Sequence, residues 1–411
     1  MRPFASATEP PLPVDEAVAR VLAEIHPLES ESVPLDASLG RVLRQEVVAP
    51  FDVPPHDNSA MDGYAVLAGD TAAAPARLRV IEDLAAGRTS TRSVESGTAV
   101  RIMTGAAIPA GADAVAPVEI TDAGSETVTI HRSIAPGANV RLRGDDMQAG
   151  ATVLPAGVRL GAAELAVAAA ARQARLVVGR RPAVAILATG DELSRVSEKS
   201  DGSRTVDSNS YALAALVAEA GAVARQSPIV RDTREATVAA IEQVLDCDFI
   251  LTTGGVSVGA YDFVKDAVER LGGRTHFWRV AMKPGKPVLF ASLRNRLFFG
   301  LPGNPVSAMV SFAVFVAPAI RKALGESSVT APLVRIRTGA RLQGAGDRRA
   351  YLRVRVVARD GELIAEPMRA QGSHIATSMV GANGLAIVDG DAVEAGDLVP
   401  VMMLGPITAS T

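Results

Sequence analysis

Two glycine-containing loops are the stretches of this sequence most suited to holding an anion. In the first, residues 251–266 (LTTGGVSVGAYDFVKD), Gly254 and Gly259 have the spacing of a phosphate-binding P-loop. Ala260 and Tyr261, however, stand where a P-loop continues with lysine and serine or threonine. Glycines let the backbone approach an anion, and free N–H groups at a helix start favour negative charge. The loop therefore predicts an anion site, and the alternative is an ordinary strand-to-helix turn.

The second loop follows the apolar run AVAILA. Thr189 and Gly190 come directly after this run, and Asp191 and Glu192 follow them. Ligands gather at the carboxyl ends of parallel strands, so two such loops in one sheet reinforce each other.

A pair of lysines supplies positive charge. Lys283 and Lys286 lie in the stretch MKPGKP, whose prolines fix φ and restrict the neighbouring residues. Both side chains can then be held near one anion, although a solvated basic turn is the usual alternative. The stretch GLPGNPVSA follows closely and opens an apolar helix. Its candidate binding residues are Pro302, Gly303, Asn304 and Ser307.

Carboxylates at the ends of predicted loops indicate a magnesium site. Asp191, Glu192, Asp232 and Asp262 all lie there. Acidic groups beside phosphate loops commonly hold Mg²⁺, which keeps waters and bridges phosphate oxygens. The alternative is surface solubility, and for Asp232 a helix N-cap is equally plausible.

Three polar strings in the first half of the chain have the composition of turns. They are DNSAMDGYA (57–65), MTGA (103–106) and RLRGDD (141–146). Binding is the alternative interpretation. Together with the loops, they predict a protein that binds a phosphorylated or nucleotide-like ligand, with Mg²⁺. No Ser-His-Asp or Cys-His set is evident, which argues against covalent acyl transfer.

The elements that must position these residues fall into four predicted domains. Strands alternate with helices over 182–325, which predicts an α/β domain with a parallel or mixed sheet. Short β-like runs predict an inserted β-rich domain over 51–145. Helical patterns on either side of it predict a discontinuous helical domain, 12–50 plus 146–181. A last β domain covers 330–411, with a hairpin at Asp360-Gly361. The fold class is therefore multidomain α+β.

Composition narrows the function further. The chain has 411 residues, 48% of them hydrophobic, and a net charge of −3, which argues against wholesale nucleic-acid binding. The single cysteine, Cys247, allows no disulfide framework, and five scattered histidines make a zinc site unlikely. The longest apolar run, 306–320, falls short of a membrane span and is expected to be a buried helix. A cytoplasmic protein that does not bind membranes is expected.

The strings above, with DSN, TGDEL, KPGKP and QGSH, occur here in one order over about residues 12 to 405. In this combination the chain closely resembles the MoeA family of molybdopterin molybdenumtransferases, which includes the gephyrin E domain. The resemblance implies an elongated homodimer with a C-terminal β-barrel-like domain and an active site shared between subunits. The α/β domain would be similar to the molybdopterin adenylyltransferase fold. The reaction would insert molybdate into adenylylated molybdopterin, with release of AMP, and would need Mg²⁺.

The resemblance also implies roles for individual residues. Catalytic roles would fall to Glu192, Asp62, Asp262, Lys283 and Lys286, and metal binding to Asp62, Asp146, Glu192, Asp232 and Asp262. Substrate would be bound by Thr104, Arg141, Thr189, Gly190, Gly254, Gly255, Ser257, Gly259, Pro302, Gly303, Asn304, Ser307, Arg348 and Ser373. Asp62 and Thr104 would come from the partner subunit. Ala260 replaces a frequent acidic residue, which puts metal binding near Asp262 in doubt.

Two other functions stay open. The α/β domain alone would also fit the molybdopterin adenylyltransferase, whose product is the substrate named above and which is a candidate partner in the pathway. A non-catalytic scaffold on the same dimer is the second alternative. The β-rich insertion and the C-terminal domain favour molybdenum insertion.

Overall fold

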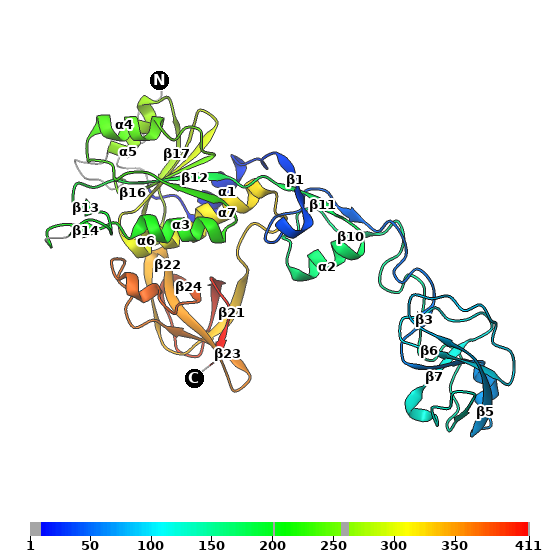
Figure 1. Ribbon diagram of the computed structural model, residues 1–411. Coiled ribbons are helices and arrows are strands. Elements are labelled where there is room, and N and C mark those ends of the chain that lie inside the picture. The colour runs from blue at the N-terminus through cyan, green and yellow to red at the C-terminus, as the bar shows by residue number, and fades with distance from the viewer. Residues whose placement is uncertain (1–9, 200–201, 256–262, 410–411) are drawn as a thin grey trace.

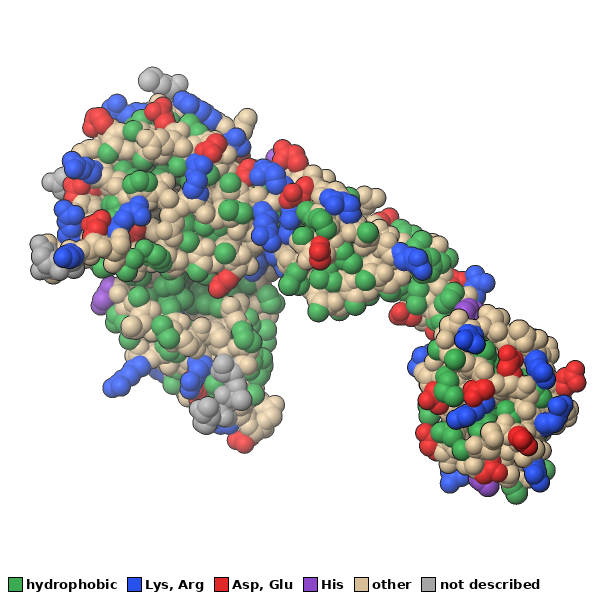
Figure 2. Space-filling model, in the orientation of Figure 1, with side chains coloured by type: hydrophobic (Ala, Val, Ile, Leu, Met, Phe, Trp, Pro, Cys, Tyr) green, Lys and Arg blue, Asp and Glu red, His purple; other side chains and the backbone are tan. Residues whose placement is uncertain are grey.

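The computed structural model describes residues 10–199, 202–255 and 263–409 and shows an elongated molecule (Figure 1). A bulky end contains the central sheet and the C-terminal strands, and a narrow neck leads from it to a small β-rich module. The space-filling view shows the same division, with the β-rich module standing apart from the bulky end (Figure 2).

A six-stranded mixed sheet lies at the centre of the bulky end. Its first four strands run parallel, and the fifth runs antiparallel to both of its neighbours, the fourth and the sixth. In sheet order they are β15 (Val223–Gln226), β12 (Ala183–Ala188), β16 (Phe249–Thr253), β20 (Arg296–Leu301), β19 (Pro287–Leu293) and β17 (Arg274–Arg279). The apolar runs AVAILA and FILTT are almost entirely buried because helices cover both faces of the sheet.

Alternate residues of each central strand belong to different cores. Ile186 and Leu251 pack on the face covered by α1 (Val14–Ala23), α3 (Asn209–Glu219) and the helix that begins at Pro305. Leu187 and Ile250 pack on the opposite face, against α4 (Arg234–Glu242) and α5 (Phe263–Arg270). This two-residue period is what a strand buried on both sides requires. The predicted strand-helix alternation therefore forms a two-faced α/β domain.

One long helix runs through the core in three consecutive pieces. These are α6 (Pro305–Ser311), a π-helical turn (Phe312–Val316) and α7 (Ala317–Leu324). At 20 residues it is long and apolar enough to cross a membrane, so the expectation that it falls short of a span is wrong. The predicted burial is confirmed, because 78% of its apolar window is buried inside the protein. A core helix passes the same test of length and composition.

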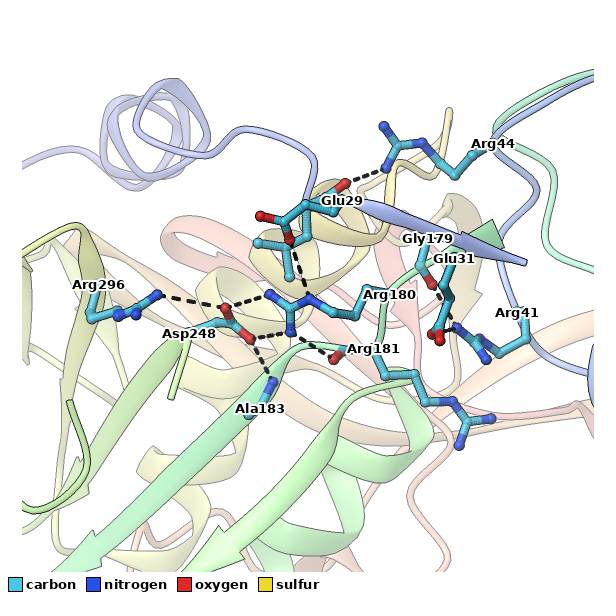
Figure 3. Close-up of polar contacts among 11 residues, drawn as sticks. Glu29, Glu31, Arg41, Arg44, Gly179, Arg180, Arg181, Ala183, Asp248 and Arg296 are labelled. Carbon is cyan, nitrogen blue, oxygen red and sulfur yellow. Dashed lines mark hydrogen bonds and ion pairs between the residues drawn. The ribbon is translucent and has the colours of Figure 1, made fainter. Parts of the chain in front are cut away.

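The neck consists of chain segments that run out to the β-rich module and return. β1 (Ser30–Pro34) pairs with β11 (Arg175–Gly179), and β2 (Val47–Val48) pairs with β10 (Thr152–Leu154). Helix α2 (Ala162–Ala170) packs on these short sheets. Directly after β11, Arg180 donates from Nη1 and Nη2 to the two carboxylate oxygens of Asp248, each at 2.9 Å (Figure 3). Asp248 lies just before β16, so this ion pair fixes the neck to the central sheet.

Two further sheets complete the molecule. The β-rich module holds a five-stranded sheet in the order β7-β4-β6-β5-β8 and a two-stranded sheet, β3-β9. Its strands are β3 (Asn58–Ser59), β4 (Gly63–Val66), β5 (Ala76–Leu84), β6 (Thr98–Ile102), β7 (Ala114–Pro117), β8 (Thr127–Ile130) and β9 (Val140–Arg141).

The C-terminal sheet has seven strands and packs beneath the central sheet. They are β18 (Met282–Lys283), β21 (Leu333–Thr338), β22 (Leu342–Arg359), β23 (Glu362–Pro367), β24 (Gly384–Val393), β25 (Leu398–Met403) and β26 (Thr408–Ala409). The predicted hairpin is confirmed: β22 and β23 pair across Asp360 and Gly361, which both have positive φ.

Candidate functional site

The carboxyl ends of three neighbouring parallel strands meet at one edge of the central sheet. The loops after β12, β16 and β20 begin with Thr189, Gly254 and Pro302. Asn209, at the start of α3, joins two of these ends by donating to Thr253 Oγ1 at 2.8 Å and to the Gly303 carbonyl at 2.7 Å. Asn209 was not among the predicted site residues, although the string DSN contains it.

The first glycines of the predicted anion loop occupy positions where only glycine fits. Gly254 has φ 95° and Gly255 has φ 64°, both in the left-handed region. A methyl group at Gly254 would lie 2.7 Å from the Thr189 carbonyl oxygen, so the two loops touch closely. The remaining predicted residues of this loop, Ser257, Gly259 and Asp262, lie outside the described residues.

A pocket of about 300 Å³ lies between the loops after β12 and β16. Glu192 is exposed in its wall, just before β13 (Leu193–Ser194), which pairs with β14 (Thr205–Val206). Thr189 contributes a buried hydroxyl, which has no hydrogen-bond partner among the described residues. This pocket offers a carboxylate and a free hydroxyl beside a glycine loop.

A larger cleft of about 590 Å³ lies between the central sheet and the C-terminal sheet. Its wall carries five cationic side chains, and none of the described residues that line it is Asp or Glu. The cations are Lys283, Lys286, Arg341, Arg348 and Arg353. Of these, only Arg341 has an ion pair among the described residues, with Glu394 at 2.9 Å. The cleft therefore carries positive charge that the described part of the chain does not neutralise.

Strand pairing explains how the lysines reach this cleft. β18 joins the C-terminal sheet by pairing with β22, which aligns Lys283 with the buried Ala350. Gly285, at φ 102°, turns the chain close to the long core helix, where a methyl group would lie 2.7 Å from Ser311 Oγ. Lys283 and Lys286 stay exposed at the cleft.

The QGSH string closes the cleft from the C-terminal side. Asn304 donates from Nδ2 to Ser373 Oγ at 3.2 Å, and the Val306 N–H donates to the Ser373 carbonyl at 3.1 Å. Ser373 is thereby held against the start of α6. The structure thus brings seven predicted residues to one cleft: Lys283, Lys286, Pro302, Asn304, Ser307, Arg348 and Ser373.

The predicted residues between Asp62 and Asp146 lie elsewhere in the chain. Asp62 Oδ1 accepts hydrogen bonds from the backbone N–H and the hydroxyl of Thr104, both at 2.7 Å. These bonds hold the pKa of Asp62 below its usual value. Arg141 pairs with Asn58 in the β3-β9 sheet, and the Asp146 N–H donates to the Val53 carbonyl at 2.9 Å. In one chain the β-rich module lies far from the central and C-terminal sheets, between which the cleft lies (Figure 1).

The acidic residues predicted to bind metal lie on separate elements, and Asp262 lies outside the described residues. Among the described residues there is no group of three or more His, Cys, Asp or Glu side chains placed to hold a metal ion. Asp232 accepts at Oδ2 from the Asp191 N–H at 3.4 Å. It does not cap helix α4, so that interpretation is wrong: the N-cap is Thr233, whose hydroxyl accepts from the Ala236 N–H at 3.2 Å.

A cationic cleft at the carboxyl ends of parallel strands defines a protein built to hold a large anionic ligand. Comparison with known proteins narrows this class. The chain matches the MoeA N-terminal region (domain I and II) over residues 12–171, a probable molybdopterin binding domain over 185–322, and the MoeA C-terminal region (domain IV) over 335–404.

Similarity to individual proteins extends along nearly the whole chain. Molybdopterin molybdenumtransferase 2 of Mycobacterium tuberculosis is 39% identical over 387 residues, which span 92% of this chain and 94% of that one. Molybdopterin molybdenumtransferase of Bacillus subtilis is 36% identical over 408 residues, or 96% and 94% of the two chains. The crystal structure of the molybdopterin biosynthesis moeA protein from Pyrococcus horikoshii OT3 aligns with a TM-score of 0.82 at 28% identity, covering 96% of this chain and 100% of that one. The chain belongs to the MoeA family.

Proposed function

We propose that this protein is a molybdopterin molybdenumtransferase, which inserts molybdate into adenylylated molybdopterin and releases AMP during molybdenum cofactor biosynthesis. The observation that carries this proposal is the cleft of about 590 Å³, which has five cationic side chains and no acidic residue among its described lining. Molybdate is a dianion, and the adenylylated pterin carries a pyrophosphate group. Both need cationic and N–H donors around them.

Each part of the cleft has a role in this reaction. Lys283, Lys286 and Arg348 neutralise the charge of the pyrophosphate and of molybdate, and Ser373 donates a hydroxyl beside them. Gly254 and Gly255 present the backbone to the phosphate-bearing ligand. Such chemistry depends on positioning and charge neutralisation more than on a covalent nucleophile. The exposure of Lys283 and Lys286 at the cleft supports their proposed role in binding the anionic ligand.

The remaining predicted residues are proposed to arrive from a second subunit. Asp62, Thr104 and Arg141 lie on the β-rich module, and Asp146 follows the module in the sequence. Figure 1 shows this module far from the central and C-terminal sheets of the same chain. In a homodimer, the module of one subunit can complete the cleft of the other. The proposed domains fit this arrangement, because the discontinuous helical domain carries the β-rich module outward. The domains are the helical domain, 12–50 plus 146–181, the β-rich domain, 51–145, the α/β domain, 182–325, and the last β domain, 330–411.

Mg²⁺ usually binds through one or two carboxylates, and waters and phosphate oxygens complete its ligand set. Among the described residues of one chain, no three ligating side chains form a cluster. In the proposed dimer, Glu192 and Asp232 of the central domain would hold the ion together with Asp146 and with Asp62 of the partner's module. We therefore assign no reaction step to the metal. A cytoplasmic location and an interaction with the adenylyltransferase of the pathway complete the proposal.

The assay that tests the function follows AMP. Purified protein is incubated with adenylylated molybdopterin and Mg²⁺, with and without molybdate. Molybdate-dependent release of AMP is expected from the wild type, whereas Glu192→Gln is expected to bind the ligand but turn it over at least about 10²-fold more slowly. Absence of molybdate-dependent AMP release would refute the proposal.

The same purified protein distinguishes molybdenum insertion from the two alternative functions, adenylyl transfer and a non-catalytic scaffold. Formation of adenylylated molybdopterin from molybdopterin and ATP would identify an adenylyltransferase. Equal turnover by Glu192→Gln and wild type would remove Glu192 from the catalytic set. Ligand binding without any turnover would indicate a scaffold.

A further inference from the structure

Two chain segments connect the neck to the β-rich module, and we call them together the joint (Figure 1). The outgoing segment, 49–57, leads from β2 to β3, and the returning segment, 142–151, leads from β9 to β10. Two short loop segments without bonds between them would act as a hinge. The direction in which the module points therefore depends on the bonds that join the two segments to each other.

Backbone hydrogen bonds join the segments on both sides of residue 52. Toward the neck, the Ala49 N–H donates to the Ala151 carbonyl at 2.9 Å. Toward the module, Val53 and Met147 exchange two bonds, from the Val53 N–H at 2.8 Å and from the Met147 N–H at 3.1 Å. Between these contacts, the side chain of Asp52 binds the opposite segment.

The Asp52 carboxylate uses both oxygens for this purpose. Oδ1 accepts from the Ala149 N–H at 2.8 Å, and Oδ2 accepts from Arg143 Nε. The backbone bond from Ala149 and the bond from Arg143 hold the pKa of Asp52 below its ordinary value. The Arg143 N–H in turn donates to Asp57 Oδ1 at 2.8 Å, at the far end of the outgoing segment. Bonds to an ionised acceptor are shorter and stronger than neutral ones, so the carboxylate is the firmest side-chain link across the joint.

The position of this link matters more than its contribution to folding. The Arg143 side chain is 66% exposed, and an exposed ion pair adds little to the free energy of folding. The module beyond the joint carries the bonded pair Asp62 and Thr104. A small rotation at the joint moves this pair through a larger distance, and a misplacement of about 1 Å at a reacting site can cost about 10²-fold in rate.

We propose that Asp52 is a positioning residue, whose carboxylate locks the two segments of the joint and so sets the direction in which the β-rich module meets the cleft of a second copy of this chain. The inference rests on the proposed function, because that function assigns residues of the module to the partner's site. Asp52 acts through the joint and does not contact the substrate.

The first test compares Asp52→Asn with a matched control, Asp122→Asn. An asparagine keeps the shape of the side chain but turns one acceptor oxygen into a donor. Asp122 also accepts backbone bonds, from the Gly124 N–H at 3.2 Å and the Thr129 N–H at 2.9 Å, but it lies within the module. For Asp52→Asn, kcat/KM for molybdate-dependent AMP release is expected to fall at least about 10-fold. A change below about 2-fold is expected for Asp122→Asn, and an equal loss in both variants would overturn the proposal.

Mixed dimers separate positioning from a general loss of stability. A dimer of Asp52→Asn and Glu192→Gln chains has one intact cleft, which receives the unaltered module, so about half of the wild-type activity is expected. In a dimer of Asp52→Asn and Asp62→Ala chains, one cleft receives a module without Asp62 and the other receives a module with the altered joint. This dimer is expected to be no more active than the Asp52→Asn protein. Equal activity of the two mixed dimers would overturn the proposal.

Small-angle X-ray scattering tests the joint without an activity measurement. The longest interatomic distances are expected to change in Asp52→Asn and to match the wild type in Asp122→Asn, and identical distance distributions for Asp52→Asn and the wild type would overturn the proposal. If the wild type releases no AMP, the proposed function fails, and scattering still tests Asp52. If Asp52→Asn does not fold, Arg143→Gln takes its place, since it removes only the exposed half of the pair. Unchanged scattering of Arg143→Gln would then overturn the proposal.

Discussion

Lys283 and Lys286 are exposed cations whose charge no described carboxylate neutralises. An exposed lysine contributes little to folding, so its substitution affects mainly the ligand. Arg353 differs from the two lysines because its side chain is buried and donates hydrogen bonds to the carbonyls of Ala370 and Gly372. The cleft thus combines cations that can contact a ligand with a cation that supports its wall.

Lys286→Met is expected to lower kcat/KM for molybdate-dependent AMP release about 10²-fold, because a donor to the anionic substrate is lost. The free energy of unfolding should change by less than about 0.5 kcal/mol. Steady-state kinetics and chemical denaturation measure the two quantities. Lys199→Met, at an exposed lysine outside the cleft, is the control and should change neither. An Lys286→Met enzyme with wild-type kinetics would remove this lysine from the site.

β22 is the element on which the cleft depends most. It carries Arg348 and Arg353 on the cleft wall and pairs with β18, which carries Lys283. Between the two arginines lies Tyr351, whose ring belongs to the same core cluster as Phe312 of the long helix. Packing of β22 on the central domain therefore sets the width of the cleft.

Tyr351 makes this packing sensitive to alkali. Burial raises the pKa of Tyr351 to about 12, above the ordinary value of 10.0. A group whose pKa is raised on folding contributes stability that is complete below pH 10 and is lost as pH rises through 12. The loss is about 2–3 kcal/mol. Melting curves of wild type and Tyr351→Phe from pH 8 to 12 measure it. The stability of the wild type relative to Tyr351→Phe should fall by this amount as pH rises, and a constant difference between the two proteins would contradict the prediction.

Much of this arrangement follows from local sequence. Apolar runs AVAILA and FILTT, with helical patterns between them, predict the α/β domain, and Asp360-Gly361 predicts the β22-β23 hairpin. KPGKP and GLPGNPVSA, which lie close together in the sequence, both contribute residues to the cleft. These features depend on short-range propensity and on the rule that parallel strands end at one edge.

What the residues alone did not predict depends on contacts distant in sequence. Nothing around Arg353 distinguishes it from an exposed strand arginine such as Arg355. Its burial follows from the docking of the C-terminal sheet. Likewise, Asn209 gains its role only when α3 approaches Thr253 and Gly303. The N-cap of α4 shifted by one residue, from Asp232 to Thr233, because both residue types can cap.

The whole molecule separates two sets of predicted residues. The neck holds the β-rich module far from the central sheet, and Arg180-Asp248 anchors the neck at its base (Figure 3). A single chain therefore keeps the module that carries Asp62 apart from the domain that carries Glu192. Two subunits in opposite orientations would bring the residues together twice, once in each of two equivalent sites.

Mixed dimers test this assembly. Asp62→Ala and Glu192→Gln chains are co-expressed with different affinity tags, and the mixed dimer is isolated. One of its sites then has both residues intact, so about half of the wild-type AMP release is expected although each variant alone is inactive. A mixed dimer of Glu192→Gln and Lys286→Met is the control. Each of its clefts keeps one defect, so it should stay inactive, and equal activity of the two mixed dimers would rule out a shared site.

The most direct test of the cationic cleft is a crystal structure of the protein with AMP and molybdate bound. The account predicts molybdate in the cleft between the central and C-terminal sheets, within hydrogen-bond distance of Lys283, Lys286 or Arg348, with AMP at the neighbouring glycine loop. Molybdate bound elsewhere on an otherwise accessible molecule, with this cleft empty, would contradict it.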